Sequence, residues 1–307
     1  MRKSKQGRDI SGILLLDKPL GVSSNKALQT VKYLYEANKA GHTGSLDPLA
    51  SGMLPICLGE ATKFSQYLLA EQKRYLTTAK LGVTTTTGDA EGEVVEICEV
   101  NLPSEKELHA IINNFKGPGQ QVPSMFSALK HKGQPLYKFA RRGIDVERKA
   151  RDIIIHAIEC LNIDGDCLYL DVTCSKGTYI RSLVEDIGKT LNCGAHVAEL
   201  RRLAVGQFTS GMVTLEMLDE RFAEKGFAGI DELLLDTGVA TQGFMTYTVN
   251  SDDITRLGQG QRIPAKPDIT PQWVSLYSEA DEFVGLGEVS EAHELIPRKL
   301  MRRWARQ

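Results

Sequence analysis

Apolar and polar residues along the chain follow two different periods, which predict an alternation of strands and helices. Apolar residues at every second position, or in short runs, predict strands over residues 13–16, 74–81, 92–100, 153–163 and 167–174. Apolar residues at helical spacing predict helices after Ser23, after Ser104 and from Ile180 onward, with a shorter helix near residues 61–68. Residues 164–166, Asp-Gly-Asp between two strands, predict a hairpin turn.

Residues 41–59 follow neither period. They contain four glycines and two prolines, which mark turns rather than the interior of a helix or strand, yet they are too apolar for a solvated loop. We therefore expect a tightly turned loop that packs inward and holds its polar side chains in fixed places. Pro48 fixes its own φ and biases Asp47 toward an extended backbone. Asp47 is then a carboxylate on a stiff backbone; the alternative is an aspartate that starts a turn or caps a helix.

The helical spacing ends around residues 241–243, where we expect a domain boundary. Beyond it, short strands at 273–277 and 283–289, separated by glycine-rich turns, predict a small β-barrel. The chain is therefore expected to divide into a domain of residues 1–243 and a C-terminal module of residues 244–307.

The composition is typical of a folded protein but does not identify a binding partner. The chain has 307 residues, of which 42% are hydrophobic, and its net charge of −2 does not by itself indicate a nucleic-acid binder. Residues 130–151 nevertheless form the most basic stretch, with Tyr137 and Phe139 among the cations. Such a stretch is either a solvated helix face or a surface that binds phosphates and stacks on bases. A second basic segment ends the chain and surrounds Trp304 with Arg298, Lys299, Arg302, Arg303 and Arg306.

Several site types have no signature in the sequence. The six cysteines form no Cys-x-x-Cys pair, and there is no P-loop and no Gly-x-Gly-x-x-Gly motif after a strand, so we expect a site without metal or cofactor. Scattered cysteines fit a reducing cytosol. The N-terminus lacks an apolar run typical of a signal peptide, and no stretch approaches the ~20 apolar residues of a membrane span. A cytoplasmic, soluble protein is expected.

A single rigid carboxylate can perform nucleophilic or acid–base chemistry. Glycoside hydrolysis needs a second carboxylate, which Asp89 or Glu91 could supply, so that alternative stays open. An ionised Asp47 would be favoured by a nearby arginine, which lowers the pKa of a carboxyl group. Arg181 lies near the start of a predicted helix and off its apolar stripe, where it could form a surface ion pair with Glu185.

Several segments in order along the chain resemble the TruB family, the bacterial tRNA pseudouridine-55 synthases. The most specific is Gly-His-Thr-Gly-Ser-Leu-Asp-Pro-Leu-Ala at residues 41–50. The resemblance extends over nearly the whole chain, through residues 17–23, 42–60, 74–75, 85–92, 123–128 and 176–181. Small departures occur at Ser45 and Ser51, and at Phe126, where the family often has tyrosine, which puts any role for a hydroxyl there in doubt.

The resemblance implies the reaction and its catalytic residues. The family breaks the bond between N1 of a T-loop uracil and the ribose, rotates the base and rejoins it through C5. Asp47 would be the catalytic carboxylate, which either attacks the ribose C1′ or removes a ribose proton. Tyr75 would stack on the uracil and take the C5 proton late in the reaction, and Arg181 would pair with Asp47 and keep it charged.

The remaining implied site residues surround the base. Tyr179 and Leu200 would line its pocket, and His42 would fill the space that the flipped base leaves or stack beside it. Flipping costs a few kcal/mol, and aromatic stacking of about 1–3 kcal/mol per base is large enough to offset it.

The implied fold is α+β: a mixed, mainly antiparallel central sheet flanked by helices, followed by a small PUA-like module that leans on tRNA. Residues 118–151 would form an arm over the RNA, which is recognised by its shape and splayed-out loop bases. The implied partner is the T-arm of tRNA; no protein partner is implied, and a monomer is expected. Two other functions remain open, a tRNA-binding or tRNA-folding factor and a glycosidase or base-excising enzyme.

Overall fold

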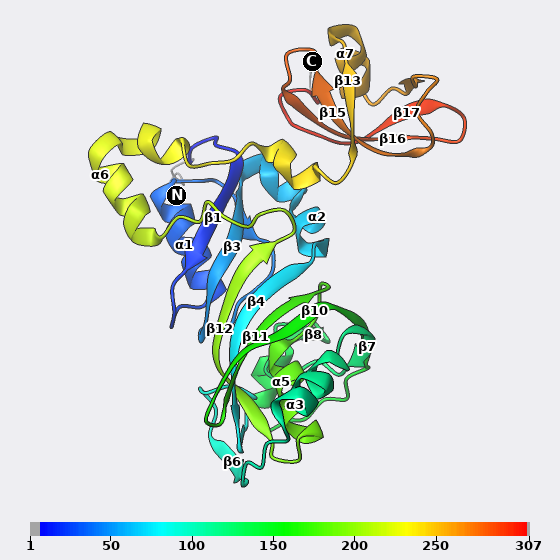
Figure 1. Ribbon diagram of the computed structural model, residues 1–307. Helices are drawn as coiled ribbons and strands as arrows, with labels where there is room; N and C mark the ends of the chain where they lie inside the picture. Colours follow the sequence, from blue (N-terminus) through cyan, green and yellow to red (C-terminus); the bar gives the residue numbers. More distant parts are fainter. Residues whose placement is uncertain (1–6, 306–307) are drawn as a thin grey trace.

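The computed structural model describes residues 7–305, and within this range the main sheet has eight strands. Seven of them follow the order β1-β3-β12-β4-β11-β10-β7, with β2 paired to β3 (Figure 1). The strands are β1 (Gly12–Lys18), β2 (Ala40–His42), β3 (Ala50–Leu58), β4 (Lys73–Leu81), β7 (Gly117–Gln121), β10 (Arg151–Asp164), β11 (Cys167–Cys174) and β12 (Ala195–Val205). Only the β3–β12 pair is parallel, so the expected mixed, mainly antiparallel sheet is confirmed.

The helices cover this sheet in two groups. They are α1 (Ser24–Leu34), α2 (Ser65–Ala70), α3 (Glu105–Asn113), α4 (Leu136–Ala140), α5 (Ile180–Thr190) and α6 (Leu215–Asp231), with 3-10 helices η1 (Gly59–Lys63) and η2 (Thr237–Thr241). Helices α3 and α5 share one buried cluster with β4, β10, β11 and β12, whereas α1 and α6 pack on β1 and β3. The predicted N-cap is confirmed, because the Ser23 side chain accepts a hydrogen bond from the N–H of Lys26.

The prediction that residues 41–59 form a loop is wrong for their second half, which is strand β3, an interior strand between β1 and β12. Position 52 of this strand requires glycine. Its φ of +100° is unfavourable for other residues, and its backbone lies so close to β12 that an added Cβ would be 2.2 Å from the carbonyl oxygen of Arg202. Strand β3 also contains a proline, Pro55, which has no backbone N–H to donate. Its carbonyl accepts a hydrogen bond from the N–H of Thr43, so its ring nitrogen points to the same edge of β3 as that carbonyl. At that edge β12 pairing has ended and β2 pairing has not begun, so the missing N–H costs no strand hydrogen bond.

The basic stretch at residues 130–151 is not a helix face. It contains the two-residue strands β8 (Lys130–His131) and β9 (Gln134–Pro135), the five-residue helix α4 and irregular backbone. Strands β5 (Val83–Thr85) and β6 (Val94–Ile97) form a separate hairpin at one end of the molecule (Figure 1). No helix within residues 7–305 is long and apolar enough to cross a membrane.

The C-terminal residues form a second, five-stranded sheet at the other end (Figure 1). Its strands run in the order β13-β15-β16-β17-β14 and are β13 (Met245–Val249), β14 (Ile263–Pro264), β15 (Gln272–Ser278), β16 (Phe283–Val289) and β17 (Glu294–Leu300), accompanied by α7 (Ser251–Gly258). The predicted small β module is confirmed. It has its own core and also packs on the main domain, where the rings of Phe64 and Phe283 meet edge to face. Of the predicted basic tail, Arg306 lies outside the described residues.

Candidate active site

A pocket of about 380 Å³ lies between the Asp47 loop, strand β4, the first turn of α5 and the segment of residues 127–129. It is lined by five of the six residues that the sequence singled out, namely Asp47, Tyr75, Tyr179, Arg181 and Leu200. These residues come from four separate segments of the chain, since Tyr179 and Arg181 both lie at the start of α5. His42 does not line the pocket; it lies in β2, and its Nδ1 atom is buried without a hydrogen-bond partner among residues 7–305.

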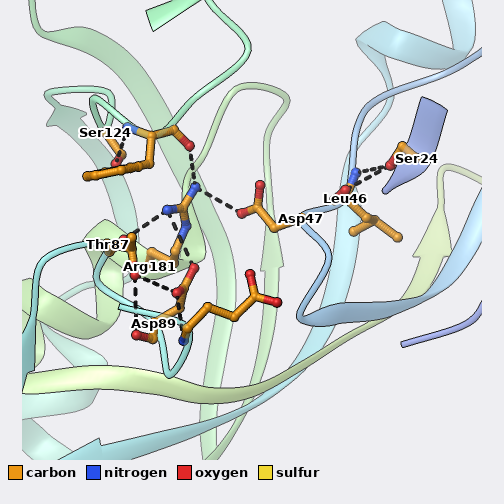
Figure 2. Close-up of polar contacts among 9 residues, drawn as sticks. Ser24, Leu46, Asp47, Thr87, Asp89, Ser124 and Arg181 are labelled. Carbon is orange, nitrogen blue, oxygen red and sulfur yellow. Dashed lines mark hydrogen bonds and ion pairs between the residues drawn. The ribbon is translucent and has the colours of Figure 1, made fainter. Parts of the chain in front are cut away.

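The backbone around Asp47 is held from both sides. The hydroxyl of Ser24, in the first turn of α1, donates to the carbonyl of Leu46 at 2.8 Å and accepts from its N–H at 2.7 Å (Figure 2). The carbonyl of Pro48 accepts from the N–H of Gly21 at 2.8 Å. The residues on either side of Asp47 are therefore pinned, and the carboxylate sits on the stiff backbone that the sequence predicted.

Arg181 joins Asp47 to the rest of the site. Its Nη2 atom lies 2.9 Å from Oδ2 of Asp47 and also donates to the carbonyl of Phe126 at 2.9 Å, while Nη1 donates to the carbonyl of Thr87 at 2.8 Å (Figure 2). Only 5% of the Arg181 side chain is exposed, so the alternative of a surface ion pair with Glu185 is wrong. The helix stripe did not reveal this burial because loops outside α5 cover the side chain.

A second carboxylate shares the same guanidinium. Oδ2 of Asp89 lies 3.5 Å from Nη1 of Arg181, and Oδ1 accepts hydrogen bonds from the Thr87 hydroxyl at 2.6 Å and from the N–H of Glu91 at 3.2 Å (Figure 2). Asp89 is buried and does not line the pocket, and Glu91 lines a separate cavity of about 730 Å³. Neither acid faces the pocket opposite Asp47, as a second glycosidase carboxylate would.

The charge state of Asp47 follows from two opposing effects. Burial raises the pKa of its carboxyl group, the Arg181 guanidinium pulls that pKa back, and the nearby negative charge of Asp89 adds to the increase. Arg181 therefore lowers this pKa, as expected of a nearby arginine, but desolvation is the larger effect and the net shift is upward. Since 41% of the Asp47 side chain remains exposed, pocket water limits this desolvation.

Tyr75 and Leu200 stand on neighbouring strands. Tyr75 in β4 is buried, and this burial raises the pKa of its hydroxyl. Leu200 in β12 is paired with Thr77 of β4 and with Ala50 of β3, which places it at the junction of the parallel and antiparallel parts of the sheet. The two side chains thus enter the pocket from the sheet that forms its floor.

Tyr179 is held just before α5. Its backbone N–H donates to Oε1 of Gln121 at 2.7 Å, and its carbonyl accepts from Nε2 of the same side chain at 3.0 Å. Gln121 is the last residue of β7, so a single glutamine side chain ties the start of α5 to the edge of the sheet. This contact positions Tyr179 and Arg181 together.

Three polar residues of the pocket were missed by the sequence reasoning. Ser127 is buried and its hydroxyl has no hydrogen-bond partner among residues 7–305. Lys73 donates to the carbonyls of Leu69 and Glu71 at 2.8 and 2.5 Å, and burial lowers the pKa of its ammonium group to about 8. The third is Arg202, a buried residue of β12. Its position two residues after Leu200 on a strand was the available signal, because alternation places both on one face.

No cluster of three or more His, Cys, Asp or Glu side chains suited to a metal ion occurs within residues 7–305.

Three family models match consecutive parts of the chain. The N-terminal domain model of the TruB family pseudouridylate synthases matches residues 32–180, and the C-terminal domain model of tRNA pseudouridylate synthase B matches residues 181–240. A model of the C-terminal part of pseudouridine synthase II TruB matches residues 247–301.

Curated relatives match the chain over nearly its full length. The tRNA pseudouridine synthase B of Nitrosococcus oceani is 50% identical over 306 residues, which cover 98% of each chain. That of Stutzerimonas stutzeri is 52% identical over 298 residues, which cover 96% of this chain and 97% of the relative. Among solved structures, a chain of the crystal structure of a Cbf5-Nop10-Gar1 complex is 26% identical with a TM-score of 0.74, over 96% of this chain and 87% of that one.

Proposed function

Because this chain belongs to the TruB family of pseudouridine synthases, we propose that it isomerises the uridine at position 55, in the T-loop of tRNA, to pseudouridine. The observation that carries the proposal is the Asp47–Arg181 pair, 2.9 Å apart at the wall of a pocket that Tyr75 also lines. A volume of about 380 Å³ lies within the range of sites for small ligands and suits one extruded nucleoside.

Each residue then has a role that its contacts support. Asp47 acts on the ribose, either by attack at C1′ or by removal of a ribose proton, and both routes need the ionised carboxylate that Arg181 favours. Tyr75 stacks on the uracil, while Tyr179 and Leu200 line its pocket. Asp89 acts through Arg181 and fixes the direction of its guanidinium. His42 lies outside the pocket, beside the Asp47 loop, where it could fill the space left in the RNA.

The surface around the pocket offers unneutralised cations to an RNA backbone. The exposed basic residues of the arm are Lys130, Lys132, Lys138, Arg141, Arg142, Lys149 and Arg151. Among the cations of residues 130–151, the one ion pair found within the described chain is that of Arg148 with Asp145. Free cations beside a pocket for a flipped base support binding of the T-arm, since phosphate contacts dominate the affinity of such complexes.

The organisation of the chain completes this proposal. Residues 1–243 form the catalytic domain, residues 118–151 the arm, and residues 244–307 a PUA-like module that contacts the same tRNA. We also propose that the protein works as a cytoplasmic monomer without cofactor. The unpaired arm cations favour a second function as a tRNA-folding factor, which would persist in a catalytically inactive variant.

The central experiment mixes unmodified tRNA transcript with the full-length protein and maps pseudouridine along the product. The parent should modify one position, Asp47→Asn should abolish modification, and both should bind tRNA with similar affinity. Asp186→Asn, which removes a carboxylate from the exposed side of α5, is the matched control and should retain activity. Modification by Asp47→Asn would end the catalytic assignment, and free uracil or an abasic product would support a base-excising enzyme instead.

A further inference from the structure

Arg202 is the largest fully buried side chain of the described residues, with 1% of its surface exposed. None of the ion pairs within residues 7–305 includes it, although Arg181 and Arg201 on neighbouring elements both have carboxylate partners. A buried charge without a counter-ion is costly. A guanidinium in this situation at the wall of a pocket indicates that negative charge arrives there during function.

The two hydrogen bonds of Arg202 hold its side chain in place without neutralising it. Nε donates to the carbonyl of Met53 at 2.7 Å, and Nη2 donates to the carbonyl of Gly44 at 3.0 Å. These carbonyls lie on either side of the segment that carries Asp47. The guanidinium is therefore fixed by backbone groups, and its direction does not depend on a bound substrate.

Tyr75 stands directly opposite Arg202. The two residues are register partners in the antiparallel pair of β12 and β4, and both line the pocket. Directly opposed residues on one face of a sheet have Cβ atoms about 4.5–5.5 Å apart. The guanidinium is close enough to the Tyr75 hydroxyl to oppose the increase that burial causes in the pKa of this group.

The other cations of the pocket have different neighbours, and the register partners of Lys73 are Cys174 and Val205 rather than Tyr75. Arg181 faces Asp47 and Asp89, and the ammonium group of Lys73 donates to backbone carbonyls at the end of α2. Arg202 is thus the buried cation of the pocket whose register partner on the facing strand is Tyr75.

We propose that Arg202 is a positioning residue for Tyr75, which orients the tyrosine oxygen and stabilises negative charge on it while that oxygen exchanges protons with the uracil. This inference rests on the proposed function. Arg202 needs no direct contact with the base, since it acts through the Tyr75 oxygen.

The proton balance of the reaction explains why such charge must be stabilised. Isomerisation adds one proton at N1, where the bond to the ribose has broken, and removes one from C5, where the new bond has formed. If the Tyr75 hydroxyl gives its proton to N1 of the detached uracil anion, the tyrosine oxygen becomes negative. When that oxygen then takes the C5 proton, the electrons of the C5–H bond restore the C5–C6 double bond of the uracil, and the tyrosine is neutral again. No outside reactant is required.

A double-mutant cycle tests whether Arg202 acts through the tyrosine oxygen. The rate of a single turnover on tRNA is measured for the parent, Arg202→Gln, Tyr75→Phe and the double variant. Arg202→Gln should slow the parent by roughly 10²-fold, the size of effect expected for an electrostatic donor at a developing charge. It should cause little further loss once the hydroxyl is absent, because coupled residues are not additive. Arg202→Lys, which keeps the charge, should recover part of the rate.

An isotope measurement separates proton transfer from a structural effect. The same variants act on tRNA whose target uridine carries deuterium at C5. Deuteration should slow Arg202→Gln by a larger factor than it slows the parent, because removal of the C5 proton has become slow in the variant. Arg201→Gln, a change on the adjacent residue that loses the pair with Asp17 and a hydrogen bond to the Ser51 hydroxyl, should show the isotope effect of the parent.

The outcomes separate the inference from the proposed function. Additive losses in the cycle, or an unchanged isotope effect in Arg202→Gln, would show that Arg202 merely supports the Asp47 loop. If Arg202→Gln does not fold, or folds but does not bind tRNA, the cycle is run with Arg202→Lys and judged in the same way. A parent that forms no pseudouridine in tRNA would overturn the proposed function itself, and the inference with it.

Discussion

The buried carboxylate of Asp89 offers a direct test of how the Asp47–Arg181 pair is tuned. In Asp89→Asn the side chain keeps its shape and one acceptor oxygen but loses its charge. The hydrogen bonds from Thr87 and from the N–H of Glu91 become neutral, and the ion pair with Arg181 is lost. Hydrogen bonds to charged groups contribute about 1.5–3 kcal/mol and neutral ones about 0.5–1.5 kcal/mol. The free energy of unfolding should therefore fall by about 1–3 kcal/mol.

The same change should alter catalysis in two ways. Arg181 loses one of the groups that orient it, and about 1.4 kcal/mol of lost transition-state stabilisation slows a reaction tenfold. The pKa of Asp47 should fall at the same time, because the negative charge of Asp89 is one of the causes that raise it. Activity that needs ionised Asp47 disappears as the pH falls through this pKa, so the acid limb of the rate profile should move to lower pH in the variant.

The assay is single-turnover pseudouridine formation from acidic to neutral pH, with urea unfolding of the same preparations. Asp186→Asn is the control for loss of one carboxylate, and its profile should match that of the parent. An acid limb that stays in place or moves to higher pH in a folded Asp89→Asn variant would refute the coupling of the two acids through Arg181.

Three other predictions concern the RNA surface, strand β3 and a buried lysine. Binding of tRNA should weaken steeply with salt, and Arg141→Gln with Arg142→Gln should reduce the slope of log affinity against log salt by about two, whereas an unchanged slope would move the RNA elsewhere. Gly52→Ala should lower the free energy of unfolding by about 2–5 kcal/mol, since its Cβ would lie 2.2 Å from a backbone oxygen of β12. Urea unfolding of Gly117→Ala, at a φ of +110° but with nothing within 4 Å of the added Cβ, should show a loss of only about 1–2 kcal/mol. Equal losses in the two variants would contradict the role of the close approach. Burial lowers the pKa of Lys18 from 10.5 to about 8, so between these values the unfolded chain binds more protons and stability should rise with pH, a trend that urea unfolding should find weakened in Lys18→Met.

Local patterns in the sequence were sufficient for most of the elements. The N-cap at Ser23, the hairpin at residues 164–166 and the helix from Ile180 depend on residues within a few positions of one another. The same holds for the Asp47 loop, whose glycines and prolines set its turns. Such features can be predicted because hydrogen bonds and φ preferences act over a single turn or strand pair.

The sequence by itself determined the candidate site: an aspartate at residue 47 on a stiff backbone, which the proposed reaction uses together with Tyr75 and Arg181. Only the tertiary structure decided that residues 50–58 form an interior strand, because Gly52 is accommodated by β12, about 150 residues later in the chain. Tertiary packing also decided that Arg181 is buried between two acids and that Arg202 faces Tyr75. These contacts form only when strands and loops that are distant in the chain pack together and exclude water from the charged side chains. No local sequence pattern encodes such contacts.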